Sequence, residues 1–105
     1  MLPINGKITT ELYNIYTVPT KKLGYITNIK MNNTANSNYT IELYQYSKAT
    51  KNSVLLYKYE LEAGKMLNDS FEYRLPAGDS FSAKASVNTV VFVINGYELD
   101  TVWYK

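Results

Sequence analysis

Residues 39–61 read YTIELYQYSKATKNSVLLYKYEL and predict an antiparallel hairpin with a polar loop at 47–52. In this register one face of the hairpin is almost wholly apolar, with Tyr39, Ile41, Leu43 and Gln45 opposite Leu61, Tyr59, Tyr57 and Leu55. The other face sets Glu42 against Lys58, a cross-strand ion pair that contributes about 0.2–1 kcal/mol. Because a slip of one residue would mix the two faces, we expect this register.

Short runs with strand character recur along the rest of the chain, separated by turns rich in Gly, Pro and Asn. None of them has the helical period of about 3.6 residues. We expect strands at 11–18, 23–31, 39–46, 53–61, 66–75, 80–87 and 89–99. This spacing predicts an all-β fold, a small antiparallel β-sandwich of about seven to eight strands with a jelly-roll or immunoglobulin-like (Ig-like) topology. The expected organisation is an N-terminal arm at 1–10, a β-sandwich domain at 11–100 and a C-terminal aromatic tail at 101–105.

The later strands divide their faces in two different ways. Residues 80–87 alternate, with Phe81, Ala83 and Ala85 on one face and small polar or charged side chains on the other. Such alternation is typical of an antiparallel sheet that packs one face on the core and exposes the other to solvent. Residues 90–94, in contrast, read VVFVI and are apolar on both faces. We therefore expect either a central strand there, or a strand whose outer face meets another chain.

The composition excludes several classes of function. The chain has 105 residues and no His or Cys, which removes imidazole catalysis, thiol chemistry, disulfides and metal sites that need those ligands. Ser80 and Ser82 have no His or activated Lys as a partner, so nucleophilic catalysis is not expected. A net charge of +2 is too small to indicate binding to nucleic acid or to a membrane. With no leader or membrane-spanning run in the sequence, we expect a protein made in a cytoplasm, without cofactor or metal.

Paired carboxylates are the remaining candidates for chemistry. Glu60 and Glu62, and likewise Glu98 and Asp100, share one strand face at a spacing that a hydrolase could use. The alternative is that these carboxylates are charges on a solvent-exposed sheet face or at the end of a strand. We favour this alternative and expect no catalytic residue, while the hydrolase stays the least favoured hypothesis.

Both ends of the sequence are apolar, reading LPI at 2–4 and VWY at 102–104, whereas termini are usually polar. An apolar segment in water lacks a stabilising partner, so each end should fold back on its own domain or dock on a neighbouring subunit. Outward residues of the doubly apolar run are further candidates for contacts. The expected interface residues are Leu2, Ile4, Val91, Val93, Val102, Trp103 and Tyr104.

Tyrosine is abundant, with 11 residues in the chain. Tyr44 and Tyr46, together with Tyr25 and Trp103, could stack on sugar rings, because large amphipathic rings are frequent at contacts. The more common role of such rings is to cover the sandwich or to pack on a neighbouring chain. Tyr44 and Tyr46 are the possible ligand-binding residues.

Six stretches together resemble a family of small all-β accessory proteins of tailed-phage virions. They are YTVPTKK at 16–22, YITNIKMNNT at 25–34, IELY at 41–44, LEAGKML at 61–67, LPAGDSF at 75–81 and VINGYE at 93–98. Members of this family occur as capsid-associated, head-fibre or tail-fibre β-sandwich modules. Their first turn commonly reads Val-Pro-x-Gly-Lys-Lys, whereas here Lys21 directly follows Thr20 and no Gly is present.

The resemblance covers roughly residues 12–99 and implies a bacteriophage structural protein without enzyme activity. It implies a virion protein made in the host cytoplasm, either an auxiliary capsid protein or a head-fibre component. Its partners would be other virion proteins, capsid or fibre subunits, and it would be a homo-oligomer or present in many copies. The alternative is a tail-fibre or receptor-binding module that recognises a host surface glycan.

Overall fold

A computed structural model describes residues 4–87 and 90–101, and these residues form eight β-strands and no helix. The strands are β1 (Ile4–Ile8), β2 (Tyr13–Thr17), β3 (Lys22–Asn32), β4 (Tyr39–Ser47), β5 (Asn52–Leu61), β6 (Met66–Leu75), β7 (Ser80–Ala85) and β8 (Val90–Asp100). The all-β prediction is therefore confirmed. Within the described residues, no helix is long and apolar enough to cross a membrane.

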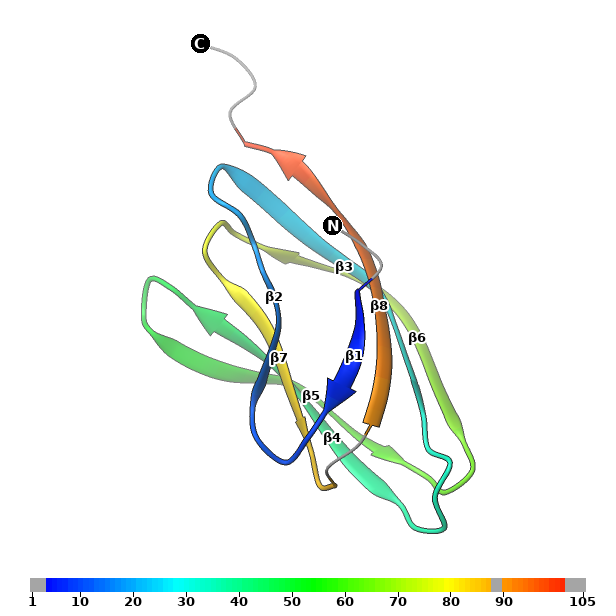
Figure 1. Cartoon of the computed structure of the whole chain (residues 1–105). Helices are drawn as coiled ribbons and strands as arrows, with labels where there is room; N and C mark the ends of the chain where they lie inside the picture. Colours follow the sequence, from blue (N-terminus) through cyan, green and yellow to red (C-terminus); the bar gives the residue numbers. More distant parts are fainter. Residues whose placement is uncertain (1–3, 88–89, 102–105) are drawn as a thin grey trace.

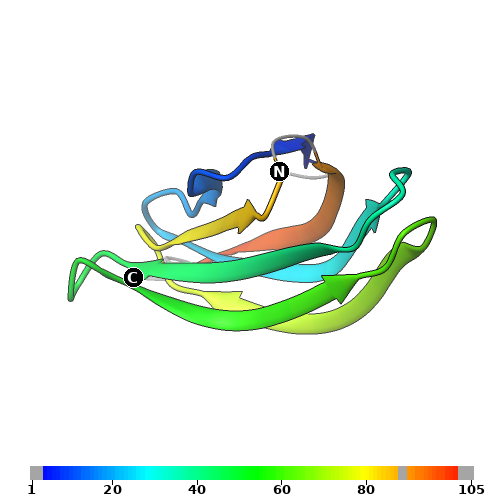
Figure 2. The ribbon, with the colours of Figure 1, turned by 90° about the horizontal axis from the view of Figure 1, so that it is seen from below.

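The strands form two four-stranded antiparallel sheets that face each other as curved layers (Figures 1 and 2). Sheet A has the order β1-β8-β3-β6, and sheet B has the order β2-β7-β4-β5. Most connections pass from one sheet to the other, and only β4 and β5 form a hairpin within a sheet. Of the two topologies that the sequence left open, this order is that of the jelly roll.

The hairpin of β4 and β5 has the predicted register from Tyr39, opposite Leu61, as far as Leu43, opposite Tyr57. Beyond that point a β-bulge shifts the pairing by one residue, since Tyr44 lies opposite Leu55. The predicted pair of Gln45 with Leu55 is thus wrong, because Gln45 lies opposite Val54. The bulge leaves Leu56 without a direct partner, and its side chain packs against the core instead. This gain of apolar contact explains the shift.

The core fills the space between the two sheets. Its largest side chains are Phe81 from sheet B and Phe92 from sheet A, both essentially without solvent exposure. Around them lie aliphatic side chains of the same inward alternation, among them Ile8, Ile26, Ile29, Ile41, Leu43, Leu75, Val90 and Ile94. The predicted inward face of β7 is confirmed, since Phe81, Ala83 and Ala85 are all buried.

Strand β1 was not predicted, and it lies within the segment expected to be an N-terminal arm. It pairs with β8, placing Ile4 opposite Ile94 and Ile8 opposite Val90. Ile8 is fully buried, and Ile4 is half-buried against the core. A Cβ at Gly6 would lie 3.3 Å from the ring of Phe92. Glycine thus lets the strand pass close to this ring.

The turn before β3 contains a strained residue. Lys21 has a φ of 66°, in the left-handed region that non-glycine residues rarely adopt. It occupies the place where the sequence departs from the glycine-containing turn of the virion proteins that the chain resembles. A Cβ in this conformation costs about 1–2 kcal/mol.

Lys21→Gly should therefore stabilise the protein by about 0.5–1 kcal/mol, because relief of the strain outweighs the greater freedom of glycine in the unfolded chain. Urea denaturation followed by circular dichroism measures the change. The matched control is Lys7→Gly, an exposed position inside β1, which should lower stability by about 0.5–1 kcal/mol. Equal destabilisation by both substitutions would contradict the strained turn.

Candidate functional site

An apolar groove lies at the end of sheet A where β8 begins. Its volume is about 340 Å³, and it is lined by Lys30, Met31, Asn32, Thr34, Tyr39, Met66, Val91, Phe92 and Val93. We call this site the apolar groove. Val91 is 52% exposed and Met66 is 66% exposed, so two apolar side chains at its rim face solvent in this chain.

The alternation of β8 produces this groove. Val90, Phe92 and Ile94 point into the core, which sends Val91 and Val93 to the outer face. Strand β8 is central, since it pairs with both β1 and β3, and its outer face is also open. The sequence offered two explanations for the apolar run at 90–94, a central strand or a strand whose outer face meets another chain, and these are therefore compatible. Val91 is exposed and Val93 is half-buried, whereas the inward residues on either side of them are buried.

The other expected interface residues are placed differently. Ile4 packs against its own core, which is the fold-back alternative. Leu2, Val102, Trp103 and Tyr104 lie outside the described residues. At the far end of β8, Leu99 is 48% exposed, and the ring of Tyr97 stacks on Tyr25 with centroids 4.7 Å apart. Exposed apolar surface thus flanks both ends of the β8 outer face.

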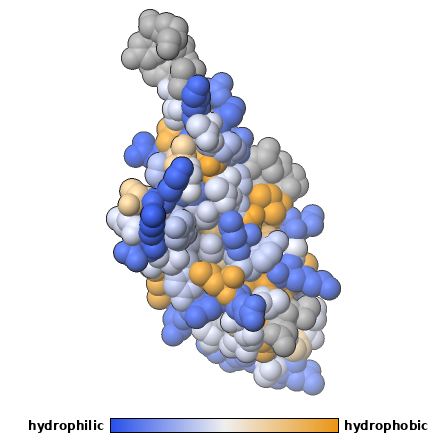
Figure 3. Space-filling view, turned by 60° about the vertical axis from the view of Figure 1, so that its left-hand side comes forward, coloured by the Kyte–Doolittle hydropathy of each residue, from blue (hydrophilic) through white to orange (hydrophobic). Residues whose placement is uncertain are grey.

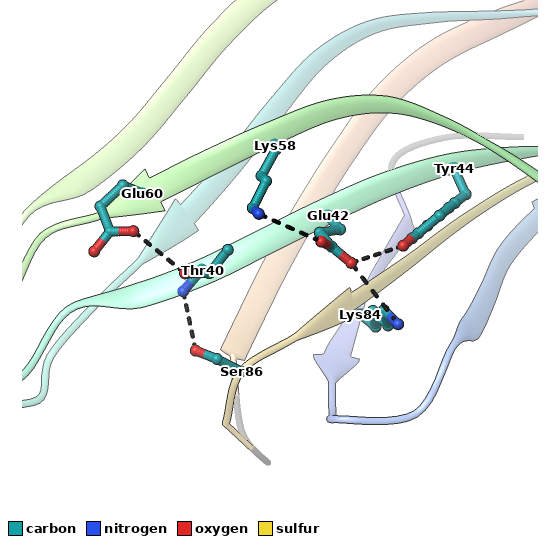
Figure 4. A network of polar contacts seen from close by, with 7 residues as sticks. All are labelled: Thr40, Glu42, Tyr44, Lys58, Glu60, Lys84 and Ser86. Atoms are coloured by element: carbon teal, nitrogen blue, oxygen red, sulfur yellow. Dashed lines mark hydrogen bonds and ion pairs between the residues drawn. The ribbon is translucent and has the colours of Figure 1, made fainter.

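The outer face of sheet B carries a polar network around Glu42 (Figure 4). The Glu42 carboxylate lies 4.0 Å from Lys58 Nζ and 3.8 Å from Lys84 Nζ, so the predicted pair with Lys58 is present and Lys84 joins it. The Tyr44 hydroxyl donates to Glu42 Oε1 at 2.7 Å, and this hydrogen bond raises the pKa of Tyr44. Lys84 Nζ also lies 5.8 Å from the centroid of the Tyr44 ring. Tyr44 is therefore engaged by its own sheet.

Tyr46 lies beside a second groove, on the same outer face. This groove has a volume of about 280 Å³ and is lined by Leu12, Asn14, Tyr46, Ser53, Ser80 and Ser82. We call it the hydroxyl groove. Ser80 and Ser82 come from β7, which lies between β2 and β4, so that these small residues form a floor between taller neighbours. The alternation of residues 80–87 placed small polar side chains on this outward face, but the sequence alone did not bring the two serines beside Asn14 and Tyr46.

Tyrosine hydroxyls connect the two sheets through hydrogen bonds to acidic or amide acceptors. Tyr16 of β2 donates to Glu98 of β8, and Tyr59 of β5 donates to Asp69 of β6 at 2.8 Å. Tyr73 of β6 donates to Gln45 Oε1. Burial raises the pKa of all three hydroxyls above the ordinary value of 10.0. For Tyr16 and Tyr59 the acidic acceptor raises the pKa further.

Three of the four carboxylates that could have supported hydrolysis are held in structural contacts, and the fourth, Glu62, is exposed. Glu98 accepts the hydrogen bond from Tyr16, and Asp100 forms an ion pair with Lys22. Glu60 accepts a hydrogen bond from the Thr40 hydroxyl at 3.2 Å. Neither the apolar groove nor the hydroxyl groove is lined by a carboxylate. Among residues 4–87 and 90–101, no group of three or more acidic side chains could hold a metal ion.

No family model and no curated protein sequence matches the chain. Similar solved structures include two crystal structures of a pentameric capsid protein isolated from metagenomic phage sequences. Each shares 14% sequence identity and a TM-score of 0.47 with this protein, over 94% of this chain. The chain spans 62% and 63% of the length of the two structures.

The raised pKa values of Tyr16, Tyr59 and Tyr73 predict how stability depends on pH. The folded protein holds these protons at a pH where the unfolded chain, with a tyrosine pKa near 10, has lost them. Their contribution is thus complete below about pH 10 and falls as the pH rises above it. With no histidine in the chain, we expect little change between about pH 6 and 9.

Urea denaturation at a series of pH values, with tyrosinate absorbance as a second probe, measures this dependence. Tyr16→Phe should make the alkaline loss of stability shallower, because it removes one of the hydroxyls with a raised pKa. A stability that stays constant up to about pH 12 would show that these protons are not held by the fold.

Proposed function

We propose that this protein is a non-enzymatic structural subunit of a phage particle, an auxiliary capsid or head-fibre component that docks on neighbouring copies. The observation that carries the proposal is the apolar groove, whose rim residues Val91 and Met66 face solvent. Contiguous exposed apolar surface on a small soluble domain is typical of a contact site. The resemblance of the sequence to accessory virion proteins agrees with a building role.

The proposed occupant of the apolar groove is the aromatic segment around Trp103 of a second copy. Within one chain, β8 separates the groove from this segment, because the strand runs along sheet A from Val90 to Asp100 (Figure 1). Nine residues of extended strand from Val91 to Asp100 span about 30 Å. Trp103 follows Asp100 by three residues and can lie at most about 11 Å from it. At this distance the segment does not reach the groove of its own chain, so we place it in the groove of a neighbouring molecule.

The chemistry of the two surfaces is complementary. The groove offers the side chains of Met66, Val91 and Val93, and Trp103 is the largest apolar side chain available to cover them. Burial of apolar area contributes about 25 cal/mol per Å². The exposed apolar residues around the groove and along β8 extend the contact toward the area of about 800 Å² per partner that stable interfaces use. Methionine at the rim can adapt its shape to the incoming ring.

Such a contact joins different surfaces of two identical molecules. Heterologous contacts of this kind form closed rings when the rotation closes, and filaments when it does not. Either outcome places many copies in one assembly, as a virion component requires. On the face shown in Figure 3, hydrophobic patches are separated by hydrophilic residues. We assign the docking role to sheet A because the rim residues of the apolar groove, Val91 and Met66, belong to its strands.

Two variants should each abolish self-association without unfolding the domain. Deletion of residues 102–105 removes the proposed occupant, and Val91→Asp places a charge at the rim of the apolar groove. Sedimentation velocity should show assemblies for the unmodified protein and monomers for both variants. The control is Val54→Asp, which changes a residue of β5 that is 56% exposed and does not line the groove.

Mixing the two variants gives a sharper result, because each retains the half of the contact that the other lacks. The mixture should form dimers and no larger species, since one interface is intact and the chain of contacts cannot continue. In phage particles, the deletion variant should fold but be incorporated less than the unmodified protein. Normal incorporation, or assemblies of the deletion variant alone, would exclude this docking mode.

A further inference from the structure

We propose that the hydroxyl groove on the outer face of sheet B binds a single neutral sugar ring. This ligand site is separate from the docking role assigned to sheet A and does not depend on it. Its volume of about 280 Å³ is slightly below the usual range for small-molecule sites, which begins at about 300 Å³. A site of this size accepts one ring of a glycan and is too small for a folded peptide element.

Ser82 provides the first indication of a ligand. Ser82 as a whole is only 4% exposed, and its hydroxyl forms no hydrogen bond among the described residues. No buried side-chain polar atom in that part of the chain lacks a partner, so this hydroxyl is open to solvent in the hydroxyl groove. A group bound there can therefore form a hydrogen bond with it in place of water.

A chain of hydrogen bonds fixes the rest of the floor. The Asn14 side-chain amide donates to Thr17 Oγ1 at 2.9 Å, and Thr17 Oγ1 lies 2.8 Å from Ser80 Oγ. Since the amide nitrogen of Asn14 is used in this way, its carbonyl oxygen is available as an acceptor. Ser80 is 7% exposed and also lines the groove. The floor therefore presents several hydroxyl and amide groups whose positions are set before a ligand arrives.

The walls are apolar and aromatic. Tyr46 of β4 stands on one side of the two serines, and Leu12, which precedes β2, stands on the other. A sugar ring has hydroxyls at its edge and C–H groups on its faces. Its edge matches the floor of Ser80, Ser82 and Asn14, and its face matches the ring of Tyr46.

The charge of the lining selects a neutral ligand. None of the six residues that line the hydroxyl groove is charged. Recognition of phosphate, sulfate or a carboxylate normally uses Arg or Lys in the site. The nearby cation Lys84 is already paired with Glu42. A nucleotide or a sialic acid is therefore a poor match, whereas glucose, galactose, mannose or N-acetylglucosamine fits the lining.

NMR titration of the full chain tests the proposal, with the methyl glycosides of these four sugars as probes. We expect saturable amide shifts for at least one of them, confined to β2, β4 and β7 around the groove. Single-ring ligands held by a few hydrogen bonds bind weakly, so the titrations should extend through the millimolar range. N-acetylneuraminic acid serves as the charged probe and should cause no such shifts.

Ser82→Ala should weaken binding about tenfold, because it removes one hydrogen-bonding group while keeping the shape of the floor. Tyr46→Ala should abolish detectable binding by removing the stacking surface. The control is Tyr44→Phe, which changes a hydroxyl bound to Glu42 outside the groove and should leave affinity unchanged. Absence of shifts with all four sugars, a Ser82→Ala variant that binds normally, or binding of the charged probe alone would each overturn the proposal. None of these results would alter the self-association measured for sheet A.

Discussion

The fold depends on apolar packing between two sheets that no disulfide joins. Phe81 and Phe92 and the aliphatic residues around them must fill the space between sheets A and B, because the chain has no cysteine to cross-link them. This constraint uses the inward face of each strand. It leaves the outward faces free, and both surface grooves are built there. The polar links between sheets, such as Tyr16 with Glu98, lie beside this apolar centre and do not replace it.

The sequence predicted those parts of the fold in which local pattern and packing agree. Glu42 lies opposite Lys58, and Phe81, Ala83 and Ala85 point inward, because a period of two residues was enough to place them. The alternation pattern failed where a contact with a residue distant in sequence determines the strand or its register. Ile8 belongs to β1 only because β8 offers a partner strand more than 80 residues away, and Leu56 leaves the register because the core accepts its side chain.

The same distinction applies to the candidate sites. Val91 could be identified as outward from the apolar run alone, since alternation assigns it to one face. The hydroxyl groove could not be identified in this way, because Asn14, Tyr46 and Ser82 lie on three different strands. Only the order β2-β7-β4 brings them together. Tyr44 and Tyr46 looked equivalent in sequence, yet the hydroxyl of Tyr44 is used by Glu42 and Tyr46 borders an open site.

The position of β8 has a consequence for how the protein is made. This strand is the last of the eight to leave the ribosome, yet it lies between β1 and β3 in sheet A. Until it emerges, β1 has no neighbour in its sheet and the core lacks Phe92. Contacts between strands so distant in sequence also slow folding. A truncated nascent chain therefore cannot form a native sandwich, which restricts folding to molecules that have been synthesised through Asp100.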